Sequence, residues 1–416
     1  MRILIPLFSP ATGTWGGLTR VVAIAQAASS AGHEVAFCAS GYLQECLSRR
    51  GYRVFPTPPT TMFGLPGPLS RLIERRSQHA SLPIKPGRSV GSIWLVLLIS
   101  GLARAGYLHR LLAAEQEAAR DFDPEALFTD LDPGAFLLSA ICGLPIASAY
   151  QGVMAEGTGS IPYCLMRRAV RAVLRAHGKT ERQPEEVFFG PSVLKIIPSI
   201  PELDGTDPSR PDVRYVGQLL GGVQAPAIDD FRPEPGRRYV FVYVGTGALP
   251  LGALRAVLPQ VFPSGSKVSC IVGAQAVERP EHLGEVRFLP YVPAEALLPQ
   301  CDWTICHGGQ NTIVQSLLFG VPLLVFPGPI FERRFNARMV QESGAGLMGE
   351  APDYRADWLR VALGTREVCA ARAVALGDRI RAYGGAAAAV DALVGWARRD
   401  RQPSAAASID ADAGHA

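Results

Sequence analysis

The sequence predicts an α/β protein of two Rossmann-like domains, each with a doubly wound parallel sheet, that face each other across a cleft. Apolar runs of strand length alternate with helix-length segments, which is the pattern of βαβ units. The pattern stops in a stretch rich in Gly, Pro and Asp and then restarts. The length of 416 residues is enough for two domains. We therefore expect a first domain at 1–217, a linker at 218–237, a second domain at 238–400 and a disordered tail at 401–416.

The first half begins with an apolar run at Arg2–Phe8. We expect a strand there rather than a signal peptide, because Ser9 and Pro10 end the run early. Two loops, 56–91 and 151–161, interrupt the later elements, and a loop as long as the first is usually functional or mobile. The remaining strands of this half are expected at 35–38, 52–55, 122–130, 145–150 and 213–217. Its helices are expected at 18–30, 93–120, 133–142 and 163–177.

The second half contains a His-Gly-Gly turn, at 307–309, between an apolar strand and a helix expected at 312–319. Glycine lets the backbone approach a ligand, and the unpaired amides and dipole of a helix N-terminus favour an anion. The turn is therefore a candidate phosphate site, the alternative being a tight turn without a ligand. A Gly-Thr-Gly turn, at 245–247, also follows a strand, and parallel sheets bind ligands at the carboxyl ends of their strands. Strands are expected at 239–244, 268–272, 286–289, 303–306 and 322–326.

Composition excludes several classes of function. The net charge is +4 and the basic residues are scattered, so nothing indicates a nucleic-acid partner. Eight cysteines without CxxC spacing favour free thiols and a cytoplasmic location. The longest apolar run, 93–102, is too short to span a bilayer. We expect a core helix there and no transmembrane segment, the lesser alternative being a weak contact with a membrane surface.

Several segments occur in a familiar order along the chain. They are Val213–Gly217, Val244–Thr246, Val286–Pro293, His307–Thr312, Gly320–Pro322 and Glu332–Ala337. Together they resemble the donor half of the family 1 nucleotide-sugar glycosyltransferases, which are UDP-glycosyltransferase-like proteins of GT-B fold, and especially the bacterial natural-product type. The N-terminal half matches more loosely, through its βαβ start and the segment 122–130.

This resemblance implies an inverting glycosyltransferase of the hexosyltransferase type, as found in antibiotic biosynthesis. It would move a sugar from a UDP- or dTDP-sugar to a small lipophilic acceptor, which is a natural product or a lipid. The first domain would bind the acceptor and the second the donor, and because the nucleotide sugar is a substrate, no cofactor is expected. No acidic pair indicates a Mg²⁺ site, and a helix N-terminus with an imidazole can stabilise the leaving diphosphate, so we predict metal independence.

The resemblance also assigns the donor residues. Tyr291 stands in place of the family's base-stacking Trp, and the backbone of Val292 would bond the pyrimidine. Gln315 stands in place of a ribose-binding Glu, which leaves UDP and dTDP sugars open. Glu332 and Arg333 stand where Asp-Gln usually binds the sugar hydroxyls. The diphosphate site would consist of His307, Gly308, Gly309, Gln310, Asn311, Thr312 and Thr246.

The acceptor side departs from the family pattern. The family places a catalytic His in the first loop, and counting along the chain puts Gly17 at that position. The acceptor-side loop, which includes Thr14, Gly16 and Gly17, contains no His. Asp130 matches the acidic partner of the missing His, so we take it as the best candidate for the general base, with Thr14 or Thr19 as alternatives. A strand-end Asp that only caps the next helix is the non-functional interpretation.

Other interpretations of the missing His remain open. The acceptor could already be nucleophilic, as a phenolate, an amine or a carboxylate is. Alternatively, the protein could be a pseudo-glycosyltransferase that binds a nucleotide sugar and assists a partner, or a sugar-nucleotide epimerase on the same fold.

Overall fold

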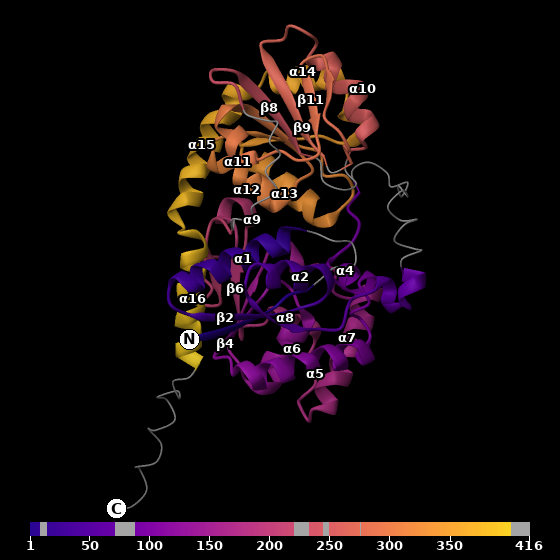
Figure 1. The fold of residues 1–416 in the computed structure, drawn as a ribbon, viewed down its shortest axis with the longest axis vertical. Coiled ribbons are helices and arrows are strands. Elements are labelled where there is room, and N and C mark those ends of the chain that lie inside the picture. Colours follow the sequence, from indigo (N-terminus) through magenta and orange to yellow (C-terminus); the bar gives the residue numbers. More distant parts are fainter. Residues whose placement is uncertain (9–14, 71–87, 220–232, 244–248, 275, 401–416) are drawn as a thin grey trace, which may run out of the picture.

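The computed structural model describes residues 1–8, 15–70, 88–219, 233–243, 249–274 and 276–400. These residues form two lobes stacked along the long axis of the molecule, each built around a seven-stranded sheet flanked by helices (Figure 1). The predicted fold class is confirmed. The expected tail, most of the linker, and the loop residues Thr14 and Thr246 lie outside the described residues.

The first sheet has the strand order β3-β2-β1-β4-β5-β6-β7, and all of its paired strands are parallel. In chain order, β1 to β3 are added toward one edge of this sheet and β4 to β7 toward the other, so the direction changes between β1 and β4. In sheets of this kind, ligands bind in the crevice beyond the carboxyl ends of the two strands at the change. The strands are β1 (Arg2–Pro6), β2 (Glu34–Ala39), β3 (Arg53–Pro56), β4 (Ala126–Thr129), β5 (Ile146–Ala149), β6 (Val193–Ile197) and β7 (Val213–Tyr215). The helices are α1 (Trp15–Ser30), α2 (Gly41–Arg49), α4 (Ile93–Ile99), α5 (Ala105–Phe122), α6 (Pro133–Cys142), α7 (Ile161–Ala176), α8 (Pro184–Phe189) and α9 (Pro201–Asp204).

The second sheet has the order β10-β11-β9-β8-β12-β13-β14 and is parallel except for the edge strand β10. Its strands are β8 (Arg238–Tyr243), β9 (Val268–Gly273), β10 (Glu281–Leu283), β11 (Val286–Leu289), β12 (Cys301–Cys306), β13 (Leu323–Val325) and β14 (Gly346–Met348). The helices are α10 (Leu251–Val261), α11 (Ala294–Leu297), α12 (Gln310–Leu318), α13 (Phe331–Glu342), α14 (Ala356–Leu363), α15 (Arg366–Ala382) and α16 (Gly385–Asp400).

The last helix, α16, returns to the first lobe, although the sequence placed residues up to 400 in the second domain. Its buried residues Ala389, Val390 and Leu393 belong to the apolar core on one face of the first sheet. Figure 1 shows α15 and α16 running along one side of the molecule from the upper lobe to the lower one. At the crossing, the amide of Gly385 donates to the carbonyl of Val216, the residue that follows β7, at 2.7 Å. Among the described residues, the chain therefore re-enters the first lobe beside Val216, close to where β7 ends.

The single helix expected at 93–120 is wrong, because the structure has α4 and α5 there. The break is at Gly101, whose φ of +77° is a left-handed conformation that favours glycine. A Cβ on Gly101 would also lie 2.6 Å from the backbone nitrogen of Gly64, so no larger residue fits that contact. The buried residues of α4, including Ile93 and Trp94, pack in the first lobe. In the described part of the chain, no helix has the length and apolarity needed to cross a membrane.

Strand β6 was not predicted, because Lys195 interrupts its apolar run. The Lys195 side chain is 2% exposed, and its Nζ donates to Asp212 Oδ2 at 2.6 Å and to the carbonyl of Gly190 at 2.9 Å. A charged side chain is buried in a strand only when it is paired and hydrogen-bonded. All eight cysteines are free thiols, as predicted.

A pair of carboxyl groups is buried behind the carboxyl end of β4. Glu115 of α5 is completely buried, and Asp132 caps α6 by accepting from the amide of Gly134 at 2.7 Å. Burial and the neighbouring Asp132 raise the pKa of Glu115 well above its ordinary value. Burial also raises the pKa of Asp132 to about 6, against the effect of the Gly134 amide. The pair therefore holds a proton at a pH where both groups would be ionised in the unfolded chain.

We predict that Glu115→Gln stabilises the protein, and more so at about pH 8 than at about pH 5. Folding raises the pKa of this carboxyl, so the folded protein keeps it protonated at a pH where the unfolded chain releases the proton. The resulting cost to the free energy of unfolding grows as the pH rises from the unfolded pKa to the folded pKa. A glutamine amide does not titrate and can donate to an ionised Asp132. Burial raises the pKa of Asp132 as well, and that part of the pH dependence remains in the variant.

Thermal melts at both pH values measure this effect. Glu117→Gln, at an exposed position of the same helix, is the matched control and should change little. A variant Glu115→Gln that melts below the wild type at about pH 8 would show that the pair is not a source of strain.

Candidate functional site

The predicted phosphate turn lies between β12 and α12, with Gly309 as the N-cap of the helix. Gly308 has a φ of +87°, and a Cβ there would lie 2.8 Å from the carbonyl oxygen of Arg333. The carbonyl of Gly308 accepts from the side-chain amide of Asn336 at 2.8 Å. Glycine is thus required at 308, because the turn packs directly against α13, which carries Glu332 and Arg333.

The imidazole of His307 is 9% exposed and belongs to this turn. Burial, together with the positive charge of Arg333, lowers the pKa of His307 to about 4, so the ring is neutral at pH 7. Nδ1 lies 3.4 Å from the carbonyl oxygen of Tyr243, which can only accept, so the proton of the neutral ring belongs on Nδ1. Nε2 faces Gly309, where an added Cβ would lie 2.8 Å from it. For Nε2 to donate to a phosphate oxygen, the ring must take up a second proton.

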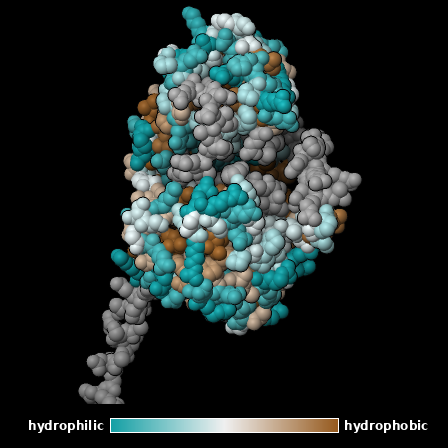
Figure 2. All heavy atoms as spheres, viewed as in Figure 1, coloured by the Kyte–Doolittle hydropathy of each residue, from teal (hydrophilic) through white to brown (hydrophobic). Residues whose placement is uncertain are grey.

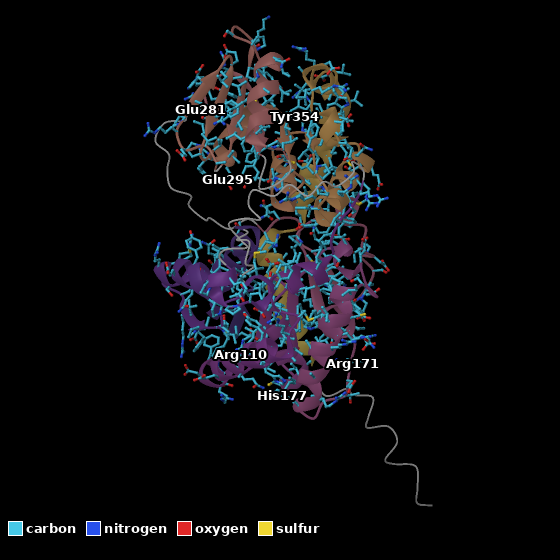
Figure 3. All side chains as sticks on the ribbon, turned by 90° about the vertical axis from the view of Figure 1, so that its right-hand side faces the viewer. Arg110, Arg171, His177, Glu281, Glu295 and Tyr354 are labelled. Atoms are coloured by element: carbon cyan, nitrogen blue, oxygen red, sulfur yellow. The ribbon has the colours of Figure 1, made fainter. Side chains whose placement is uncertain are left out.

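The predicted base and ribose residues lie around the same end of the second sheet. Tyr291 follows β11 and is 38% exposed, whereas the side chain of Val292 is buried. Gln315 of α12 lines an open hollow with Glu295 and Phe319. Figure 3 shows Glu295 on the part of the second lobe nearer to the first, whereas Arg110, Arg171 and His177 lie at the far end of the first lobe.

Tyr243 was not singled out from the sequence. It ends β8, is 39% exposed, and its ring centroid lies 5.6 Å from that of His307. Burial raises the pKa of Tyr291, and the negative charges of Glu295 and of an ionised Tyr243 act in the same direction. Two half-exposed tyrosines therefore stand beside the phosphate turn. Their strand-end positions, at 243 and just after 289, were the signal available in the sequence.

The predicted sugar residues open α13. Burial raises the pKa of Glu332, while the positive charges of Arg20 and Arg333 act in the opposite direction. Burial lowers the pKa of Arg333, and the negative charge of Glu332 opposes this. Glu332 therefore interacts with cations from both lobes, since Arg20 belongs to α1.

On the acceptor side, Asp130 lies directly against Gly17, as the sequence comparison required. A Cβ on Gly17 would lie 2.5 Å from Asp130 Oδ2. Both carboxylate oxygens of Asp130 accept from Nη2 of Arg20, at 2.9 and 3.1 Å. The sequence analysis missed Arg20, although its position one helical turn after Gly17 was a usable signal.

Contacts between the lobes connect the candidate acceptor side to the candidate donor side. Nη1 of Arg20 reaches Asn311 Oδ1 at 3.5 Å, at the start of α12. Gln151 of the first lobe donates to Asn336 Oδ1 at 3.2 Å, and both side chains are buried. Val90, at the end of the first long loop, forms a parallel bridge with Ile330 just before α13. Figure 2 shows a hollow between the two lobes with hydrophobic residues inside it.

Among the described residues, the structure therefore brings together Asp130, Gly17, Asn311, Glu332 and the His307 turn. Gly16 lies in the first turn of α1, next to Gly17. Gln310 is buried and Thr312 is half-buried at the start of α12. The roles assigned to these residues remain predictions.

Residues 253–379 match the family described as Erythromycin biosynthesis protein CIII-like, C-terminal domain. Elloramycin glycosyltransferase ElmGT of Streptomyces olivaceus is 28% identical over 257 residues, which are 59% of this chain and 62% of that protein. The alignment thus spans less than two thirds of that relative. 4'-Demethylrebeccamycin synthase of Lentzea aerocolonigenes is 27% identical over 377 residues, covering 80% of this chain and 84% of that protein.

Solved structures share the fold over nearly the whole chain. The glycotransferase of kitacinnamycin superposes with a TM-score of 0.70 at 17% identity, covering 95% of this chain and 98% of that one. Glycosyltransferase VinC, solved in complex with dTDP, superposes with a TM-score of 0.67 at 20% identity, covering 96% of this chain and 100% of that one. Both confirm the two-lobed GT-B architecture.

We predict that nucleotide-sugar affinity rises several-fold between about pH 7.5 and about pH 5.5. Without a bound anion, the ring of His307 is neutral in this range, because burial and the charge of Arg333 lower its pKa to about 4. A bound diphosphate brings negative charge and raises that pKa, so the complex takes up a proton as the pH falls. A nucleotide sugar is the suitable ligand, because its diphosphate has no group that titrates in this range.

Calorimetric titration with dTDP-glucose and UDP-glucose at several pH values measures the slope. His307→Gln is the control, since glutamine does not titrate, and it should remove the slope. An unchanged slope in the variant, or weaker binding at low pH in the wild type, would contradict the assignment.

Proposed function

We propose, from the premise that this chain is a family 1-like glycosyltransferase of the natural-product type, that it transfers a sugar from a nucleoside diphosphate to a small acceptor. The observation that carries the proposal is the meeting of the Gly17–Asp130 contact with the N-terminus of α12, through the bond from Arg20 to Asn311. A candidate acceptor side and a candidate phosphate site thus face each other across one cleft. The dTDP bound to VinC supports a pyrimidine nucleotide, so a dTDP- or UDP-sugar is the proposed donor.

The proposed reaction is a single in-line displacement with inversion. An acceptor oxygen attacks the anomeric carbon while the bond from that carbon to the diphosphate oxygen breaks, and the leaving diphosphate keeps the electron pair. The amides at the start of α12 face the growing negative charge, and a protonated His307 would donate to it. These groups supply the stabilisation for which other transferases use a metal ion, so the proposed reaction is metal-independent.

The acceptor that fits this site carries an acidic hydroxyl, such as a phenol. Residues 9–20 include no His, Asp or Glu, so the first loop and the start of α1 offer no ordinary base. Asp130 remains the candidate carboxylate, but both of its oxygens accept from Arg20. The carboxylate therefore already serves to hold the guanidinium of Arg20. A phenol, in contrast, can arrive ionised and needs no strong base.

Purified protein incubated with dTDP- and UDP-sugars and a panel of phenolic and aliphatic alcohols tests the proposal. We expect transfer to phenols, inversion at the anomeric carbon by NMR, and full activity in EDTA. Nucleotide-sugar binding without turnover, together with stimulation of a partner, would instead support the pseudo-glycosyltransferase alternative. Isomerised donor without acceptor would support the epimerase, and no binding at all would exclude every form of the proposal.

A second prediction concerns Asp130→Asn, assayed with phenols of graded acidity. If the acceptor arrives ionised, we expect a loss of about tenfold in kcat that is the same for every phenol. A general base would produce a loss of about 10²–10⁴-fold that grows as the phenol becomes less acidic. A loss that depends on acceptor acidity would therefore restore Asp130 as the base. Thermal melts check that the variant is folded.

A further inference from the structure

Arg20 is the residue at which the three parts of the candidate site meet. Its guanidinium bonds Asp130 on the acceptor side, reaches Asn311 at the phosphate turn, and is close enough to Glu332 in the sugar subsite to affect its ionisation. Its side chain is 16% exposed. The residue sits in α1 rather than in a loop, which fixes its backbone.

The guanidinium has hydrogen-bonding capacity that its protein partners do not use. Arginine carries five N–H donors in a rigid fork that matches phosphate oxygens. Nη2 donates to Asp130, whereas the one contact of Nη1 with the described residues is the long 3.5 Å contact with Asn311. Nε is buried and has no hydrogen-bond partner among the described residues. A buried donor without a partner costs about 1–3 kcal/mol, which a ligand could recover.

The charge of Arg20 is held in place by carboxylates. Burial works to lower the pKa of Arg20, but the negative charges of Asp130 and Glu332 raise it above its ordinary value. The side chain is therefore a permanent cation in a cleft with little access to water. In such a place it stabilises a nearby anion far more than it would on the surface.

We propose that Arg20, positioned by Asp130, binds the leaving diphosphate and stabilises the charge that grows on it. The inference rests on the proposed function. When the bond between the anomeric carbon and the diphosphate oxygen breaks, the electron pair stays on that oxygen, and Nη1 exchanges Asn311 for it. Arg20 donates a hydrogen bond and transfers no proton. At the position where the family has its base, this chain has Gly17, and Asp130 accepts hydrogen bonds from the cation Arg20 instead of from a histidine.

The test compares Arg20→Gln with wild type for binding of nucleoside diphosphate and monophosphate. Calorimetry with dTDP, dTMP, UDP and UMP gives the gain in affinity due to the second phosphate. We expect Arg20→Gln to reduce that gain at least tenfold while monophosphate affinity changes less than twofold. Arg20→Lys, which keeps the charge but not the fork, should recover part of it. We also expect kcat to fall with a smaller change in the KM of the acceptor.

Two further variants keep the test decisive. Arg20→Gln with Asp130→Asn removes both charges of the buried pair, so it should fold even if the single variant does not, and it should show the same loss. Arg255→Gln, which breaks an ion pair with Glu281 at 2.6 Å, is the matched control and should leave the gain unchanged. In Figure 3, Glu281 lies on the second lobe away from the first.

Equal losses for diphosphate and monophosphate would mean a merely structural role and overturn the inference. A raised acceptor KM with unchanged dTDP and UDP affinity would overturn it in favour of binding an anionic acceptor. Failure of the wild type to bind any of the nucleotides would instead overturn the proposed function itself.

Discussion

A charge removed from water must be paired, and this constraint determines how the cleft is built. Asp130 and Arg20 form such a pair, with side chains 5% and 16% exposed. Each carboxylate oxygen is bound by the guanidinium, and the guanidinium in turn extends to the second lobe. The same constraint explains Lys195 with Asp212 inside the first sheet. Where it is violated, at Glu115 and Asp132, the pKa values rise instead of a cation being recruited.

Much of the fold and the position of the candidate phosphate turn could be predicted, because those features depend on local sequence. Alternating strand and helix segments gave the two sheets, and the glycines of the turn at 308–309 indicated the close approach of backbone that the structure has. The end of a parallel strand is also a local feature, which is why Asp130 and the His307 turn could both be placed at a cleft.

The features that could not be predicted depend on contacts between distant segments. The place of Arg20 in the candidate site depends on its contact with Asp130, which lies 110 positions later in the chain. The break at Gly101 depends on the backbone of Gly64, and β6 depends on the pairing of Lys195 with Asp212. The return of α16 depends on the shape of the first lobe's core. None of these partners lies within the short window in which periodicity can be recognised.

The return of α16 has a mechanical consequence for the cleft. The described residues at which the chain leaves and re-enters the first lobe are bonded to each other, because the amide of Gly385 donates to the carbonyl of Val216. Gly217, Gly384 and Gly385 all have positive φ, a conformation that glycine adopts without strain. Because the chain leaves and re-enters the first lobe at segments that are bonded to each other, a motion of one lobe relative to the other would turn about this place. Arg20 and Asn311 would then separate and meet again.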